Sequence, residues 1–314
     1  MFDRRYFLKC LALLGTVATI ATPFSFAWEP NEPIRVLTFN ILASEPSWET
    51  DAKSRPWIER KPILLDVMRN YPDGSGPYDF IGTQETSLHD KAELHQVKQL
   101  AEEMQGYGSL YAPCNGREGV FGLTNMIFWK KDRWEIDTED SGTFWLSSTP
   151  EKPGSNDWVE NNRGGQRCVT YGLFHEIGSN GRTGKKVYFY NTHLNVHVPS
   201  ARVRSAFLIM DRIKNRKSPD TPVLLTGDFN SRRTTDPVTY FQGGKVEFDG
   251  QTCLPPFGLK EAFNVVHHDK PAPAIDFIFF NEYLKPIAAQ VIPTNKNGVY
   301  PSDHRPIEAF FEWQ

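Results

Sequence analysis

Apolar segments that end in polar residues recur along this chain, and they constrain its fold more than any other feature. The clearest covers residues 223–230, where Val-Leu-Leu-Thr-Gly precedes Asp228, Phe229 and Asn230. This pattern predicts a buried strand whose last residues carry polar groups out of the core. Asp228 and Asn230 are two residues apart, so they are expected on the same side of an extended chain. Such a pair can hold a hard cation or a water, although Asp and Asn also favour turns.

Similar patterns along the chain predict an alternation of many strands with few helices. Strands are expected at 34–39, 78–83, 126–129, 143–146, 167–175, 186–192, 223–228, 275–280, 287–292 and 307–313. Helices are expected at 57–71, 90–104 and 199–216. No repeat, low-complexity segment or linker divides the chain. We therefore expect one α/β domain with sheets packed on each other and helices outside.

Polar side chains stand at or near the ends of most of these strands: Asn40, Glu85, His193, Asp228, Asn230, Asp276, Asp303 and His304. If the strand ends share one rim, carboxylates, amides and histidines converge there. Oxygen ligands with few histidines favour Mg²⁺ or Mn²⁺ over zinc. A structural role is the alternative for each residue, such as the first turn of a helix for Glu85. Asp276 is the hardest to explain in this way, because a carboxylate inside an apolar strand needs a partner.

Six short motifs in a fixed order resemble the endonuclease/exonuclease/phosphatase superfamily. They are Phe39-Asn40, Gln84-Glu85, Asn191-Thr192-His193-Leu194, Gly227-Asp228-Phe229-Asn230, Ile275-Asp276-Phe277-Ile278 and Ser302-Asp303-His304-Arg305-Pro306. Each motif alone is weak evidence, but all six occur in the family's order. From Asn40 to His304 they span nearly the whole chain that would remain after an N-terminal signal peptide is removed. The resemblance implies a four-layered α/β sandwich, in which two packed, mainly antiparallel sheets are flanked by helices. It places the active site at one end of the sandwich.

The resemblance also implies a role for each residue in phosphoester hydrolysis. Glu85, Asn40 and Asp303 would serve a Mg²⁺ or Mn²⁺ ion. Asp228 would orient or deprotonate the attacking water, and Asn230 would hold that carboxylate or the phosphate. His193 would donate to a phosphoryl oxygen. His304 would act on the phosphate or as an acid or base, with Asp276 fixing its ring.

Further residues have a weaker claim to the site. Arg167 and Asn125 are predicted substrate contacts, because relatives carry an arginine or another polar residue at similar places. Leu42 occupies a position where some relatives have another acidic ligand, so the resemblance leaves one metal or two open. Of the four cysteines, Cys10 lies in the predicted signal peptide described below. The other three, Cys114, Cys168 and Cys253, allow at most one internal pair. No thiolate zinc motif is present.

The N-terminal residues indicate an export signal. Arg4 and Arg5 precede an apolar run that ends in a small-residue segment at 25–27. Residues 1–27 are therefore predicted to be a twin-arginine-type signal peptide, and residues 28–314 the exported domain, periplasmic or secreted. An uncleaved anchor is the alternative, but the run is short for a bilayer span. No later segment predicts membrane insertion.

The sequence thus predicts an exported, metal-dependent phosphoester hydrolase, a phosphodiesterase or a phosphatase. The alternatives are a DNA or RNA nuclease, and a non-catalytic protein that binds a phosphate ligand on the same scaffold. The formal charge of −3 for the whole chain, more negative without the signal, does not indicate broad nucleic-acid affinity. Substrate choice is expected to lie in the loops 43–55, 111–123, 147–166 and 242–257. Neither the substrate nor the oligomeric state follows from the sequence.

Overall fold

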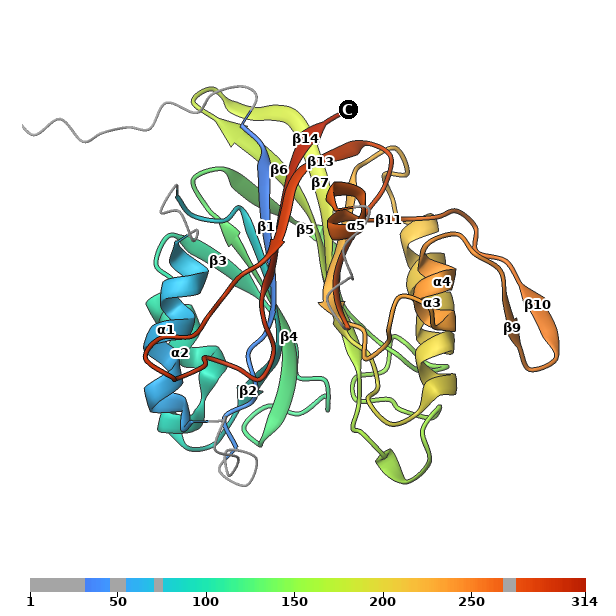
Figure 1. The fold of residues 1–314 in the computed structure, drawn as a ribbon, viewed down its shortest axis with the longest axis horizontal. Coiled ribbons are helices and arrows are strands. Elements are labelled where there is room, and N and C mark those ends of the chain that lie inside the picture. Colours follow the sequence, from blue (N-terminus) through green and yellow to red (C-terminus); the bar gives the residue numbers. More distant parts are fainter. Residues whose placement is uncertain (1–31, 46–54, 71–75, 268–274) are drawn as a thin grey trace, which may run out of the picture.

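Two six-stranded sheets pack face to face in the computed structural model, which describes residues 32–45, 55–70, 76–267 and 275–314 (Figure 1). The first sheet has the order β13 (Leu284–Val291), β14 (Ile307–Trp313), β1 (Ile34–Asn40), β2 (Phe80–Leu88), β4 (Gly122–Lys130) and β3 (Tyr107–Leu110). The second has the order β11 (Lys260–Glu261), β12 (Asp276–Phe280), β8 (Val223–Asp228), β7 (Gly181–His193), β6 (Cys168–Gly178) and β5 (Trp134–Trp145). Pairs β1–β2 and β7–β8 are parallel, and the other pairs are antiparallel.

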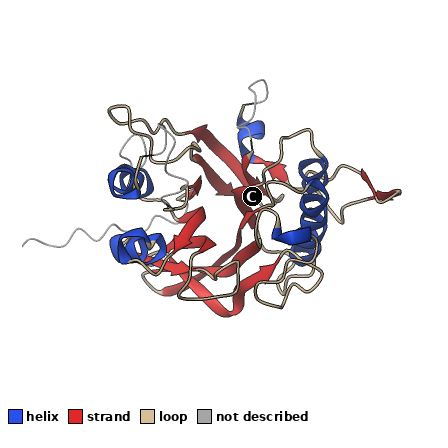
Figure 2. Cartoon of the chain, turned by 90° about the horizontal axis from the view of Figure 1, so that it is seen from below, coloured by secondary structure: helices blue, strands red, loops and turns tan. Residues whose placement is uncertain are grey.

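Helices cover the outer face of each sheet, so the domain has four layers (Figures 1 and 2). On the first sheet lie α1 (Trp57–Arg69) and α2 (Gln96–Glu103), with the short η1 (Ala92–Leu94) before α2. On the second lie α3 (Pro199–Lys214) and α4 (Asp236–Phe241). The short α5 (Ala262–Val266) contacts β12 and β13 and so joins the two sheets at one edge. A small hairpin of β9 (Val246–Phe248) and β10 (Gln251–Cys253) projects beyond α4 (Figure 1), and η2 (Glu160–Asn162) lies in a loop.

The predicted four-layered α/β sandwich is confirmed, with local differences. The strand expected at 78–83 continues through a bulge to Leu88, so the helix expected at 90–104 is reduced to η1 and α2. The strand expected at 143–146 is the end of the longer β5, whose first half carries charged residues that obscure its apolar alternation. The short elements β3, α4, α5, β9, β10 and β11 were not predicted, because they are too brief to show periodicity.

Strand alternation builds the apolar core between the sheets. On β1, Ile34 and Val36 face the opposite sheet, whereas Leu37 packs toward the helices. The same two-residue period places Val187 and Phe189 of β7 between the sheets. Aromatic rings fill this layer; the rings of Phe80 and Phe189, for example, stack with their centroids 5.1 Å apart.

The predicted signal peptide, residues 1–27, lies outside the described residues. None of the described helices combines the length and apolar character needed to cross a membrane.

Candidate active site

The space between the sheets changes from apolar to polar at one end, because the same alternation continues into polar residues. On β1, Ile34 and Val36 are followed two and four residues later by Thr38 and Asn40. On β7, Val187 and Phe189 lead to Asn191 and His193. On β8, Leu224 leads to Thr226 and Asp228, and on β12 Ile278 is preceded by Asp276. Strand pairing then aligns His193 and Asp276 on either side of Asp228.

A buried amide network joins the sheets beneath this polar end. Asn191 of β7 donates to the backbone carbonyls of Thr83 and Met126 in the other sheet, both at 2.9 Å. Its Oδ1 accepts from Gln84 Nε2 at 2.7 Å and from Thr226 Oγ1 at 3.2 Å. These hydrogen bonds of Asn191 fix the two sheets against each other below the site.

Asp228 lies at the centre of the site. Its Oδ2 accepts from Asn40 Nδ2 at 3.0 Å, and Nε2 of His193 and of His304 lie 3.4 and 3.6 Å from the same oxygen. Its Oδ1 accepts from the backbone N–H of Asn230 at 2.8 Å. Burial raises the pKa of Asp228 to about 6, and the neighbouring negative charge of Asp276 contributes. A carboxylate of this kind is suited to accept a proton near neutral pH.

His193 is held as a neutral imidazole. Arg167 Nη1 lies 2.9 Å from its Nδ1 and can only donate, so Nδ1 is the acceptor and Nε2 carries the proton. Burial lowers the pKa of His193 well below its ordinary value, and the positive charges of Arg167 and His304 act in the same direction. Its Nε2 lies 2.9 Å from Asn230 Nδ2, which donates to the Leu194 carbonyl, and 3.4 Å from Asp228 Oδ2, which is the acceptor available to the Nε2 proton. His193 therefore offers an uncharged N–H donor at the site.

His304 is held as a cation by Asp276. Its Nδ1 donates to Asp276 Oδ2 at 2.8 Å. Burial alone lowers the pKa of His304, but the Asp276 hydrogen bond and the charges of Asp276, Asp228 and Asp303 outweigh it and raise the pKa to about 10. The two histidines thus differ in charge at neutral pH, because each has a different partner on Nδ1.

Glu85 lies in the bulge of β2, where its φ of 58° is unusual for a residue other than glycine. Its Oε1 accepts from Asn40 Nδ2 at 3.1 Å, and its Oε2 accepts from the Ala43 backbone at 3.4 Å. The structural alternative considered for Glu85, the first turn of a helix, is excluded, because α2 begins only at Gln96. Such local strain is found often at functional sites.

The donor set fits a hard divalent cation. Burial raises the pKa of Glu85, and the negative charges of Asp303 and Asp228 add to this effect, so a bound cation would favour its ionised form. Asp303 is exposed and is close enough for its charge to raise the pKa of Glu85. Asn40 turns its Nδ2 toward Glu85 and Asp228, while its Oδ1 accepts from the Leu42 backbone. Asn40 therefore links the two carboxylates here, and its role as a direct ligand stays a prediction. These oxygen donors are those that Mg²⁺ or Mn²⁺ uses.

A second set of carboxylate and imidazole groups also lies close together. One ligand atom from each of Asp228, Asp276 and His304 falls within 4.8 Å of the others. The short Asp276–His304 hydrogen bond already uses two of these groups. We therefore interpret this set as an acid–base cluster rather than the metal site.

Arg60 of α1 was missed by the sequence analysis, although it supports the site. Its side chain is fully buried, and Nη1 donates to the carbonyls of Ile41 and Pro301 at 2.8 Å each. Nη2 donates to the Leu42 carbonyl at 3.2 Å. Arg60 thereby joins the turn after Asn40 to the loop that carries Asp303 and His304. A charged residue on the inner face of an amphipathic helix was the signal that could have revealed it.

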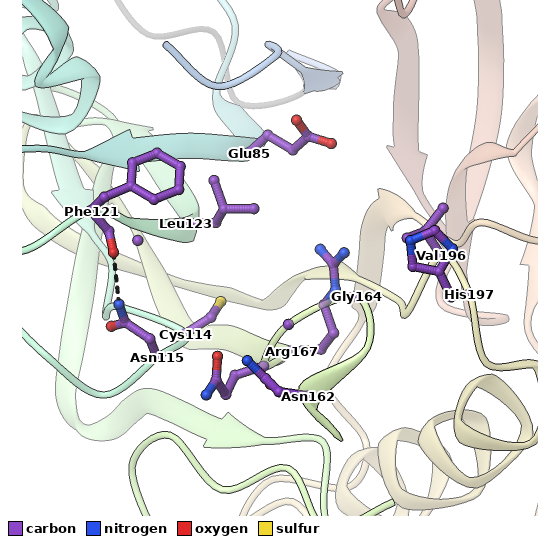
Figure 3. A pocket seen from close by; sticks show the side chains of 13 residues that line it. Glu85, Cys114, Asn115, Phe121, Leu123, Asn162, Gly164, Arg167, Val196 and His197 are labelled. Carbon is purple, nitrogen blue, oxygen red and sulfur yellow. Dashed lines mark hydrogen bonds between the residues drawn. The ribbon is translucent and has the colours of Figure 1, made fainter. Parts of the chain in front are cut away.

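A cleft of about 530 Å³ opens beside Glu85 and Arg167. In Figure 3 the Arg167 guanidinium points up from the cleft wall toward the side that carries Glu85. The Arg167 Nε is buried without a hydrogen-bond partner. A buried cation with an unpaired donor beside an acidic residue is suited to an anionic group, and substrate contact by Arg167 stays a prediction.

A disulfide bond between Cys114 and Cys168 fixes one wall of this cleft. The sequence allowed at most one internal pair, and Cys253 remains a free thiol. Asn125 lies beneath the disulfide, where its Nδ2 donates to the Cys168 carbonyl at 2.7 Å. Its side chain is only 2% exposed, so in this structure it supports the cleft wall, and substrate contact by Asn125 stays a prediction.

A family model described as the Endonuclease/Exonuclease/phosphatase family matches residues 37–304. No curated protein gives a significant match.

Several solved structures share the fold of this chain. A Bacteroides vulgatus endonuclease/exonuclease/phosphatase is 24% identical, with a TM-score of 0.70, and the match covers 90% of this chain and 99% of that chain. A mannosyl-6-phosphatase of Bacteroides thetaiotaomicron is 23% identical, with a TM-score of 0.66 and coverage of 88% and 99%. The 2′,3′-cyclic phosphatase ANGEL2, bound to adenosine-2′,3′-vanadate, is 16% identical, with a TM-score of 0.67 and coverage of 90% and 96%.

Proposed function

Because the chain belongs to the endonuclease/exonuclease/phosphatase family, we propose that it hydrolyses phosphoester bonds with Mg²⁺ or Mn²⁺ as its cofactor. The observation that carries the proposal is the surroundings of Asp228. One neutral histidine, one cationic histidine and two amides surround one buried carboxylate, with Glu85 beside it. Burying these polar and charged groups costs free energy, and packing of the core does not require them. The phosphatase activities named for two of the structural neighbours support the same reaction class.

In the proposed reaction, one side chain accepts the proton of the water and others stabilise the charge on the phosphate. Asp228 accepts a proton from the attacking water as the new phosphorus–oxygen bond forms. The ester bond then breaks, and the leaving oxygen departs as an alcohol after it takes a proton from the solvent. His193 donates its Nε2–H to a phosphoryl oxygen, and Arg167 faces the same anionic group. His304, protonated and paired with Asp276, stabilises the negative charge that develops on the phosphate. A cation at Glu85 and Asp303, with Asn40 beside them, would neutralise phosphoryl charge and orient the ester.

The test is hydrolysis of three substrates by the purified exported domain: bis-(p-nitrophenyl) phosphate, p-nitrophenyl phosphate and plasmid DNA. Each is incubated with Mg²⁺, with Mn²⁺ or with EDTA. We expect metal-dependent turnover that Glu85→Ala and His304→Ala abolish, while a surface change such as Glu139→Ala leaves it intact. Turnover that persists in EDTA or in both variants would contradict the proposal. Preference for plasmid DNA, falling steeply with salt, would identify a nuclease.

We also propose that the protein is exported through its twin-arginine-type signal. The Cys114–Cys168 disulfide supports this, because disulfides persist in oxidising compartments outside the cytosol. Cell fractionation with intact-mass measurement should recover a chain that begins near Trp28 and contains one disulfide. A cytosolic, full-length, fully reduced chain would contradict export.

A further inference from the structure

Most of the side chains that line the cleft beside the acid–base cluster have no role in the proposed reaction. Among the thirteen described residues that line it, Glu85 is the single acidic residue and Arg167 the single lysine or arginine. The other polar side chains are uncharged amides and an imidazole, from Asn115, Asn162, Gln166 and His197. Phe121, Leu123 and Val196 add apolar surface. An uncharged polar wall beside a single arginine suits one phosphate joined to a neutral, hydroxyl-bearing group.

The cleft is held open by bonds that do not depend on a ligand. The Cys114–Cys168 disulfide ties the loop before β4 to the start of β6. On the other side, Asn195 donates to the Arg163 carbonyl at 3.0 Å and accepts from the backbone N–H groups of His197 and Val198 at 2.9 Å each. Gly164 approaches Asn195 so closely that a Cβ there would lie 2.9 Å from its amide. Both walls are therefore pre-organised, as in small-molecule sites.

The same lining is poorly suited to a nucleic acid. A polynucleotide presents a phosphate at every step, and proteins bind it with several lysines and arginines. Arg167 is the single lysine or arginine among the described lining residues, and it already faces the reacting group. Phe121 is the one phenylalanine, tyrosine or tryptophan in the described lining, so the cleft lacks the series of large aromatic side chains on which single strands stack.

We propose that this cleft binds the organic part of a small phosphomonoester, a neutral hydroxyl-rich ring such as that of a hexose phosphate. The proposal rests on the proposed phosphoester hydrolysis for its catalytic meaning, but the cleft can be tested without it. In this arrangement Gln166 and His197 contact hydroxyls, and Phe121 packs against the apolar face of the ring. Arg167 holds the phosphate, together with the cation that Glu85 would bind. These cleft contacts then select among esters that share the same reaction.

The first test compares kcat/KM for a panel of hexose phosphates with kcat/KM for p-nitrophenyl phosphate. We expect Gln166→Leu to lower this ratio about three- to tenfold, the usual effect of one lost hydrogen bond between uncharged groups. Phe121→Ala should lower the ratio as well. Gln251→Leu on the projecting β9–β10 hairpin is the matched control, and it should leave the ratio unchanged. An unchanged ratio in both cleft variants, or a wild-type preference for plasmid DNA, would overturn the proposal.

A binding measurement separates failure of the cleft from failure of the hydrolysis. Calorimetric titration of the wild type with each hexose phosphate and with inorganic phosphate should show tighter binding of at least one sugar ester. Gln166→Leu should remove most of this difference. This result would support the cleft even if no ester is hydrolysed. If no hexose phosphate binds more tightly than inorganic phosphate, or if nucleoside monophosphates bind more tightly than all of them, the proposal fails even when hydrolysis is observed.

Discussion

Asn40 in one sheet donates to Asp228 in the other across 3.0 Å, and the same nitrogen donates to Glu85 at 3.1 Å. One amide thus sets the distance between the proposed base and the proposed metal ligand. The three side chains come from three strands, β1, β2 and β8. Their alignment depends on how the two sheets pack, so small changes in that packing should reach the reaction directly.

Replacing Asn40 with Leu keeps the side chain's size but removes the donor that both carboxylates share. We expect kcat to fall about thirtyfold, from the loss of about 2 kcal/mol when a buried carboxylate loses a partner. Asn281→Leu is the matched control, because Asn281 is equally enclosed and accepts from the Val223 backbone at the other end of β8. It should lower the melting temperature without the fall in kcat. Equal kcat in the two variants would contradict a catalytic role for Asn40.

The acid side of the pH profile should report Asp228. Its pKa is raised to about 6, and it accepts a proton only when ionised, so kcat/KM should fall as the pH drops through about 6. A cation bound at Glu85 would shift this fall in kcat/KM to lower pH. The positive charge of His304 favours ionised Asp228. In the His304→Gln variant, the activity that remains should therefore fall at a higher pH than in the wild type. A fall at the same pH or at a lower pH in this variant would contradict the coupling.

Arg60 should act as a positioning residue. Arg60→Met removes the three described hydrogen bonds that join residues 41 and 42 to residue 301, and an ammonium in Arg60→Lys cannot replace the guanidinium fork. We expect both variants to raise the Mg²⁺ concentration needed for half-maximal rate at least several-fold. Arg69→Met, an exposed arginine on the same helix, is the control. A lower melting temperature with unchanged Mg²⁺ dependence would show that Arg60 is only structural.

Gly82 should be needed for the close approach of the two sheets. A Cβ at this position would lie 2.5 Å from Thr226 Oγ1 and 2.7 Å from Asn191 Oδ1. Gly82→Ala should therefore destabilise the fold by about 1–3 kcal/mol through overpacking. Thermal unfolding gives the measurement. The double variant Gly82→Ala/Thr226→Ala removes one of the two clashes, so the two changes should not be additive. Additive losses would show that the sheets do not meet at Gly82.

Local sequence patterns predict much of this architecture. Alternating apolar runs predict most strands, and helical spacing predicts α1 and α3, because each pattern reflects which face of an element is buried. The polar residues at the strand ends are visible in the same way, and the structure brings His193, Asp228, Asn230, Asp276 and His304 together with Asn40 and Glu85. The bulge at Glu85 was not visible, because a bulge depends on pairing with β4.

The sequence by itself determined which residues end each buried strand, because a two-residue period assigns every side chain to a face. Only the tertiary structure decided what those residues meet. The neutral state of His193 follows from Arg167, which is 26 positions away, and the cationic state of His304 follows from Asp276, 28 positions away. The support from Arg60 and the cleft walled by the Cys114–Cys168 disulfide likewise arise from segments far apart in the chain. Charge state and cleft shape depend on burial and neighbours, and these exist only once the two sheets have packed.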